Sequence, residues 1–196
     1  MPLLEQVPDW DAIEPASEEV TVFLERAQAF VSGFLEIHES PTTGRVPGYV
    51  ATNLPFAYRA LRWVRVQAPE RRRFCEWGSG LGTVTCLASL LGFDARGIEI
   101  APSLVSAARR FASDHRREVQ FFEGSFLPEG LLHGESDLAP LERTLGFSPV
   151  AFDVVYAYPW PAERPLVLSL FERCADPGTL LVTYLGGADI RIHRKE

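Results

Sequence analysis

The feature that most limits the fold is a regular alternation of short apolar runs with amphipathic segments, which begins at Phe74. The apolar runs are bounded by turn residues, and segments with helical spacing of apolar residues separate them. Strands joined by helices in this order require right-handed crossovers. The sequence therefore predicts a mostly parallel sheet with helices on both faces. The runs predicted to be strands read RFCEW, DARGIEI, EVQFFEG, AFDVVYAY and DPGTLLVTYLG.

Two further helices are predicted upstream of the first strand. Ser17 has the character of an N-cap, because Glu18 and Glu19 follow it and apolar residues then recur at helical spacing up to Phe34. Asn53 is predicted to cap the second helix. Both helices should pack on the remainder of the domain.

The domain boundaries follow from this order of elements. We expect one domain, residues 1–196, in which residues 1–68 form a helical cap and lid and residues 69–196 form the ligand-binding core. The Ser125–Pro149 insertion is expected to join the lid. The final segment, ADIRIHRKE, alternates apolar and charged residues and is predicted to be a half-exposed edge strand, so that the sheet is shortened after its fifth strand.

Composition excludes several classes of protein. No apolar run approaches membrane-spanning length, and the acidic start without an apolar stretch predicts no signal peptide. The three cysteines are far apart and predict buried thiols in a cytoplasmic protein, and the four scattered histidines predict no metal site. The net charge of −7 makes nucleic acid an unlikely partner. The arginines of residues 58–73 are interpreted as a solvated helix face and loop, and docking of an anionic partner there is the less favoured alternative. Asp153 is predicted to have a structural role.

The stretch FCEWGSGLGTVT places a glycine-rich turn after the first predicted strand. In open α/β sheets ligands bind beyond the carboxyl ends of the strands, where this turn lies. The dinucleotide pattern G-x-G-x-x-G/A fails, because Gly78 and Gly80 are followed by Thr83, and Gly82 comes one residue early. The phosphate-binding loop that ends in Gly-Lys-Ser/Thr is also absent.

Two acidic residues indicate what the turn holds instead. Glu76 precedes the first glycine by two residues, where it disfavours a pyrophosphate and favours a cationic amino group. Glu99 ends the second predicted strand, where a carboxylate can accept hydrogen bonds from both hydroxyls of a ribose. A ligand with a ribose, an ammonium group and no phosphate describes S-adenosylmethionine (SAM).

The stretches EWGSGLG and GIEIAPSLVSAARR resemble the first motif and the following acidic strand end of class I SAM-dependent methyltransferases, over roughly Phe74 to Leu185. The resemblance implies a Rossmann-like three-layer αβα sandwich and SAM as the cofactor. It also implies cofactor contacts that extend from the methionine moiety through the ribose to the adenine. The residues are Glu76, Gly78, Ser79, Gly80 and Gly82 for methionine, Glu99 for ribose, and Ile100, Ser125 and Phe126 for adenine.

The stretch GYVATN is similar to a segment that crosses the cofactor in some lysine methyltransferases of this class, which makes Tyr49 and Thr52 candidate contacts. An ordinary loop and N-cap is the equal alternative.

The fourth strand end faces the transferable methyl group in the family, so Tyr156 is a further cofactor candidate. The Asp or Asn of amine-methylating members is missing from the YAYPWPAE segment there. Tyr158, Pro159 and Trp160 instead form a flat apolar wall that could hold a planar substrate or a methylated cation.

The residues leave several functions open. We expect a methyltransferase without an obvious catalytic base, acting on a small molecule or a protein side chain, in an unknown oligomeric state. A SAM-binding scaffold without catalysis is the alternative from a different class, and a nucleic-acid methyltransferase is less favoured. A nicotinamide-dependent oxidoreductase is disfavoured by the glycine spacing and by Glu76.

Overall fold

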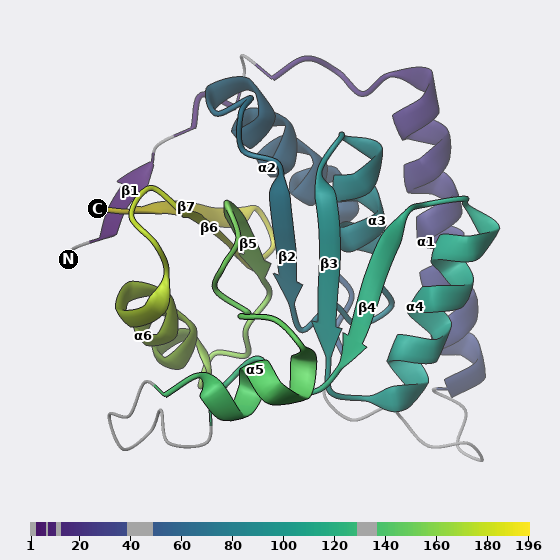
Figure 1. Cartoon of the computed structure of the whole chain (residues 1–196). Helices are drawn as coiled ribbons and strands as arrows, with labels where there is room; N and C mark the ends of the chain where they lie inside the picture. Colours follow the sequence, from purple (N-terminus) through teal and green to yellow (C-terminus); the bar gives the residue numbers. More distant parts are fainter. Residues whose placement is uncertain (1–2, 7, 11–12, 39–48, 129–136) are drawn as a thin grey trace.

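The computed structural model of the chain describes residues 3–6, 8–10, 13–38, 49–128 and 137–196 (Figure 1). Within these ranges seven strands form one sheet in the order β1-β7-β6-β5-β2-β3-β4. The strands are β1 (Leu3–Gln6), β2 (Arg73–Trp77), β3 (Asp94–Glu99), β4 (Val119–Glu123), β5 (Val154–Ala157), β6 (Leu180–Gly186) and β7 (Asp189–Lys195). The helices are α1 (Glu18–His38), α2 (Leu54–Gln67), α3 (Thr83–Leu90), α4 (Pro102–Asp114), α5 (Ala139–Leu145) and α6 (Arg164–Cys174).

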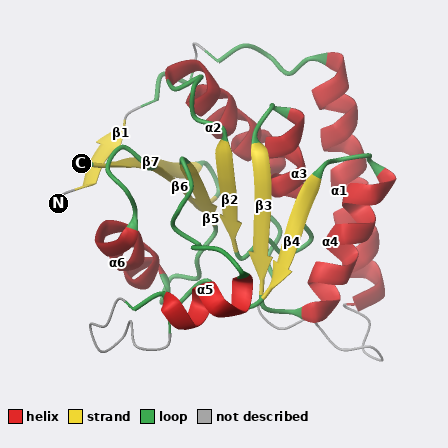
Figure 2. Cartoon of the chain, viewed as in Figure 1, coloured by secondary structure: helices red, strands yellow, loops and turns green. Residues whose placement is uncertain are grey.

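The five strands from β2 to β6 are parallel, and helices cover both faces of the sheet. Helices α1 to α4 lie together on one face, and α5 and α6 lie on the other (Figures 1 and 2). This arrangement confirms the predicted three-layer αβα fold with a mostly parallel sheet. None of the helices in the described part of the chain has the length and apolar character needed to cross a membrane.

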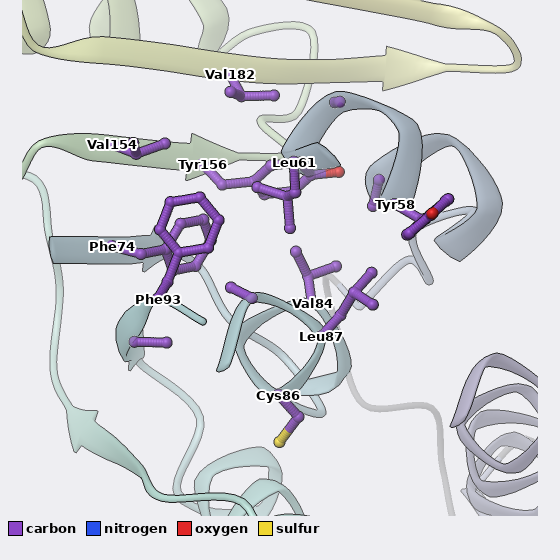
Figure 3. Packing of buried hydrophobic residues seen from close by; sticks show 14 of the residues in the cluster. Tyr58, Leu61, Phe74, Val84, Cys86, Leu87, Phe93, Val154, Tyr156 and Val182 are labelled. Atoms are coloured by element: carbon purple, nitrogen blue, oxygen red, sulfur yellow. The ribbon is translucent and has the colours of Figure 1, made fainter. Parts of the chain in front are cut away.

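Successive residues of the central strands belong to two different cores, as the pleat of a strand requires. Phe74 and Tyr156 pack against α2 and α3, whereas Cys75 and Val155 pack on the side of α6. Figure 3 shows Leu61 of α2 within the first of these cores, close to Tyr156. Each large side chain buried in this way stabilises the fold by about 1.5–3 kcal/mol. Apolar side chains on both faces therefore fix the central strands and the positions of their carboxyl ends.

The prediction that ADIRIHRKE forms an edge strand is wrong. Strand β7 pairs antiparallel with β6 on one side and with β1 on the other, and the β1 register runs from Leu3↔Lys195 to Gln6↔Ile192. Ile192 and Lys195 are consequently buried, and the Lys195 Nζ donates to the carbonyl of Glu172. The partner strand has only four residues and comes from the opposite end of the sequence. Local periodicity carries no information about such a pairing.

The two N-terminal helices pack on the sheet face beside α3 and α4. Phe23 of α1 contacts Phe111 of α4 edge-on, with ring centroids 5.9 Å apart. The Ser17 Oγ accepts from the Val20 N–H at 3.4 Å, as expected of an N-cap, whereas Asn53 occupies the N-cap of α2 without a side-chain cap bond. The predicted lid includes residues 39–48 and 129–136, which lie outside the described residues.

Several arginines of residues 58–73 are held in contacts within the fold. Arg59 donates to the Trp10 carbonyl at 2.7 Å, and Arg62 pairs with Glu14 at 2.8 Å. Asp153 accepts the backbone N–H groups of Arg72 and Arg73, both at 2.9 Å, and pairs with the Arg73 guanidinium at 2.8 Å. Burial raises the pKa of Asp153, but these bonds outweigh burial and hold it below its ordinary value. The structural role predicted for Asp153 is confirmed.

Candidate functional site

A cavity of about 540 Å³ opens at the carboxyl ends of the parallel strands. Its wall combines the turn after β2, the ends of β3 and β5, the start of α6 and the segment that precedes α2. Most of the predicted site residues line it: Tyr49, Thr52, Glu76, Gly78, Ser79, Gly80, Glu99, Ile100, Ser125, Phe126, Tyr158, Pro159 and Trp160. Gly82 and Tyr156 are not among the lining residues.

The cavity has two halves. The β2–β4 half is lined by Gly78, Gly80, Glu99, Ile100 and Ser125. The β5–β6 half is lined by Tyr158, Pro159, Trp160, Glu163, Arg164 and Leu185. Glu76 lies at the end of β2, next to β5 in the sheet, and so stands between the two halves.

The glycine turn is anchored to the end of the neighbouring strand. The N–H groups of Gly78 and Ser79 both donate to the Ile98 carbonyl at 2.9 Å. Gly80 has a φ of +52°, and a Cβ atom there would lie 2.6 Å from Cε2 of Tyr49. A glycine is required at this position for its conformation and for the close approach of the Tyr49 ring.

Gly82 serves packing rather than the cavity wall. It precedes the first residue of α3 with a φ of +72°. A Cβ atom at this position would lie 2.6 Å from Cε1 of Phe121 and 2.8 Å from the Cβ of Ala108. The glycine thus lets the start of α3 approach β4 and α4. Gly82 was expected to line the ligand. It lies instead beneath the turn and is not among the residues of the cavity wall.

Glu76 joins the strand end to the start of α3. Its side chain is only 4% exposed, and its Oε2 accepts from the Thr85 N–H at 2.8 Å and from the Thr85 hydroxyl at 2.5 Å. The carboxylate thereby satisfies an N–H of the first helical turn, which has no partner within the helix. Burial raises the pKa of Glu76 to about 8; the Thr85 hydrogen bonds act against this rise and the charge of Glu99 adds to it. Thr85 was not singled out from the sequence.

Glu99 is oriented by backbone groups on both sides. Its Oε2 accepts from the Gly80 N–H at 2.9 Å, and its Oε1 accepts from the Ala101 N–H at 2.8 Å. The side chain is 8% exposed and lines the cavity. Each oxygen retains a further lone pair for a ligand. The carboxylate is therefore fixed in place before any ligand binds.

Two tyrosines lie close to these carboxylates. Tyr49 covers Gly80 from the segment before α2. Burial, together with the charges of Glu76 and Glu99, raises the pKa of Tyr49 far above its ordinary value. Burial and Glu76 likewise raise the pKa of Tyr156, which pairs with Glu76 in the sheet register and lies in the core. Both hydroxyls remain protonated at neutral pH and can donate hydrogen bonds.

The far wall of the β2–β4 half has an apolar and aromatic surface. Ile100 is 70% exposed and lines the cavity. Phe126 stacks on Trp77, with ring centroids 5.3 Å apart and an interplanar angle of 12°. The Ser125 Oγ accepts from the Leu127 N–H at 3.0 Å, which fixes the turn after β4. This wall can hold a flat ring system.

The β5–β6 half is built from aromatic rings and the start of α6. The Tyr158 ring packs against Tyr184 with centroids 4.6 Å apart, and Trp160 is 47% exposed. Glu163 accepts from the Trp160 N–H at 3.2 Å. Arg164, which sequence reasoning did not identify, donates from Nη2 to the Leu185 carbonyl at 3.1 Å. Its only sequence signal is a charge next to the aromatic segment.

No family model matches the sequence, and no curated protein matches it. Several solved structures are similar to it. An O-methyltransferase from Bacillus cereus, solved with S-adenosylhomocysteine (SAH), has a TM-score of 0.56 and 16% identity, covering 88% of this chain and 68% of that chain. A methyltransferase from Geobacter sulfurreducens has a TM-score of 0.52 and 15% identity, and the match covers 95% of this chain and 94% of that chain. An RNA methyltransferase from Salinibacter ruber, solved with SAH, has a TM-score of 0.50 and 23% identity, and the match covers 74% of this chain and 92% of that chain.

The chain accordingly has the fold of class I SAM-dependent methyltransferases, as the glycine turn and the acidic strand ends predicted. At these identities the likeness concerns the fold.

Proposed function

We propose that the protein transfers the methyl group of SAM to a small molecule or to a protein side chain. The observation that carries the proposal is the Glu99 carboxylate, which two backbone N–H groups orient in the wall of the cavity. A carboxylate at the end of the second parallel strand, with lone pairs left on both oxygens, matches the paired hydroxyls of a ribose. A turn that lacks both phosphate-binding patterns favours a nucleoside without phosphate.

The remaining contacts of the cofactor follow from this anchor. The adenine would lie along Ile100 and Phe126, with Ser125 near its edge. The methionine moiety would extend past Gly78 toward Glu76, and its ammonium group would favour the ionised form of that carboxyl group. Tyr49 and Thr52 would cover it from the segment before α2. The acidic character of this part of the cavity suits a cofactor that carries ammonium and sulfonium charges.

The β5–β6 half would position the methyl acceptor. Transfer from a sulfonium to a nucleophile depends mainly on alignment and exclusion of water. Tyr158 and Trp160 offer a rigid flat surface for that purpose, because Pro159 separates them and Pro161 follows Trp160. The neighbours include an O-methyltransferase and an RNA methyltransferase, so their substrates do not select an acceptor for this chain.

We further propose that the protein acts in the cytoplasm and that nucleic acid is not its substrate. Cys75 and Cys86 are buried free thiols, which fits a reducing compartment. The net charge is −7, and Arg59, Arg62 and Arg73 are held by Trp10, Glu14 and Asp153.

Transfer of a labelled methyl group tests the proposal. Wild-type protein incubated with tritium-labelled SAM and cell extract should label acceptor material, and Glu99→Ala should abolish most of the label. Glu123→Ala is the matched control, because Glu123 ends the neighbouring strand β4 and lies outside the cavity. Label confined to low-mass material would exclude the protein acceptor, and label confined to polypeptides would exclude the small molecule. Binding of SAH without any labelling would contradict the proposal and support a scaffold that binds SAM.

A further inference from the structure

The β5–β6 half of the cavity contains a cation that the proposed function leaves without a role. We propose that Arg164 binds a carboxylate of the ligand in this cavity, which belongs either to the methionine moiety of the cofactor or to the methyl acceptor. The identification of the cofactor rests on the proposed function. The assignment of Arg164 rests on its own contacts.

The guanidinium of Arg164 has a fixed position. Arg164 is the first residue of α6, and its Nη2 donates to the Leu185 carbonyl near the end of β6 at 3.1 Å. This bond joins the start of the helix to a strand end on the same wall. Because one edge of the guanidinium is tied to the backbone, less side-chain entropy is lost when the remaining donors meet a ligand.

Within the described residues, the Nη2 bond to Leu185 is the one hydrogen bond that the Arg164 side chain donates. Over the described ranges, Arg164 forms no ion pair, and its Nε is buried without a hydrogen-bond acceptor. A buried donor on a cation without a partner is costly and calls for an explanation. A carboxylate in the cavity would offset this cost, because it can pair with the accessible edge of the guanidinium, which lines the cavity, and so stabilise the partly buried charge.

The charges around Arg164 favour a carboxylate over a more highly charged group. Arg164 is the one basic side chain among the described residues that line the cavity. Glu163 lies beside it in the chain, with Oε2 held by the Trp160 N–H, and Glu76 and Glu99 are bonded to their own donors. A phosphate dianion would meet the repulsion of these acids, whereas a single negative charge is matched by one guanidinium.

The position of Arg164 allows both sources of the carboxylate. Strand β2, which carries Glu76, lies next to β5, and β5 leads through the aromatic segment into Arg164. A methionine moiety that passes Glu76 would bring its carboxylate toward this wall. An acidic acceptor on Tyr158 and Trp160 would place its own carboxylate there.

Two cofactor fragments distinguish these sources. SAH carries the amino-acid carboxylate, whereas 5′-methylthioadenosine lacks it. Both are titrated calorimetrically into wild type, Arg164→Gln, Arg164→Lys and Arg173→Gln. The last variant is the control, because Arg173 lies near the other end of α6 and outside the cavity. If Arg164 holds the cofactor carboxylate, Arg164→Gln should weaken SAH about 10-fold or more and leave methylthioadenosine unchanged. Arg164→Lys should recover part of the loss.

An acceptor carboxylate gives a different result. SAH binding is then unchanged, and the SAH-saturated wild type should bind 2-naphthoate more tightly than the neutral 2-naphthamide, a preference that Arg164→Gln removes. The proposal is overturned if Arg164→Gln binds SAH like the wild type and the wild type shows no preference for naphthoate over naphthamide. Equal weakening of SAH and methylthioadenosine would also overturn it, because that result indicates a displaced wall. A wild type that binds neither nucleoside contradicts the proposed function, and the naphthoate measurement on the free protein then tests Arg164 separately.

Discussion

The two halves of the cavity are built in different ways. In the β2–β4 half the polar groups are anchored: Glu99 accepts from the N–H groups of Gly80 and Ala101, and the adjoining Glu76 is buried against Thr85. In the β5–β6 half, Trp160 is about half exposed and Arg164 keeps a buried donor without an acceptor in the described chain. The first half is organised before a ligand binds, whereas the second is completed by one.

The largest effect is expected from the buried carboxyl group of Glu76. Between its ordinary pKa of 4.5 and its folded pKa of about 8, the folded protein holds a proton that the unfolded chain has lost. The free energy of unfolding should therefore fall as pH rises, by up to about 1.4 kcal/mol per pH unit and on the order of 5 kcal/mol over the window. Glu76→Gln removes this contribution. Urea unfolding of both proteins at several pH values measures it, and parallel pH curves would show that Glu76 is not buried as described.

The next largest effect is expected at Gly82. Alanine there combines a φ of +72° with contacts to Phe121 and Ala108 that are too close, so Gly82→Ala should lower the free energy of unfolding by about 3 kcal/mol. Gly92 is the matched control: its φ is +86°, but nothing lies near its missing Cβ, so Gly92→Ala should cost only about 1 kcal/mol. Equal losses in the two variants would refute the packing role given to Gly82.

A smaller effect is expected at Thr85. Thr85→Val removes a hydroxyl bond to Glu76 but keeps the backbone bond, and should cost about 1 kcal/mol of stability and weaken SAH several-fold. Thr179→Val also removes a buried hydroxyl, which bonds the Phe152 carbonyl far from the cavity, and should affect stability alone. If both variants bind SAH like wild type, Thr85 does not position Glu76 for the ligand.

The smallest effect on stability is expected in the β5–β6 half. Trp160 is 47% exposed, so Trp160→Ala should change the free energy of unfolding by less than about 1 kcal/mol. SAH affinity should stay at the wild-type value while methyl transfer falls. A loss of SAH affinity in this variant would mean that Trp160 itself contributes to cofactor binding. Calorimetry and the labelling assay on the same preparation separate these outcomes.

The fold and the β2–β4 half could be predicted from the sequence, because both depend on local patterns. The alternation of strands and helices specifies the layers, and the acidic residues at two strand ends lie next to the turn that they serve. Gly82 shows the limit of this reasoning. A glycine that admits a ligand and a glycine that admits a neighbouring helix both need the missing Cβ, so the sequence does not distinguish them.

Other features depend on contacts between distant segments. Strand β1 pairs with β7 across almost the whole chain, and its four residues carry no alternation that predicts a strand. Arg164 meets the carbonyl of Leu185 only because α6 begins beside the end of β6. Thr85 was within reach of prediction, since the first N–H groups of a helix need acceptors and Glu76 is the nearest acid before the turn.

Calorimetric titration of SAH tests the central claim most directly. Wild type and Glu123→Ala should bind SAH equally, and Glu99→Ala should bind more weakly by roughly 1–3 kcal/mol, the scale of a lost hydrogen bond to a charged group. That result would support Glu99 as the ribose anchor of a SAM site. Absence of binding heat with the wild type, or equal affinity in Glu99→Ala, would contradict the assignment of this cavity to SAM.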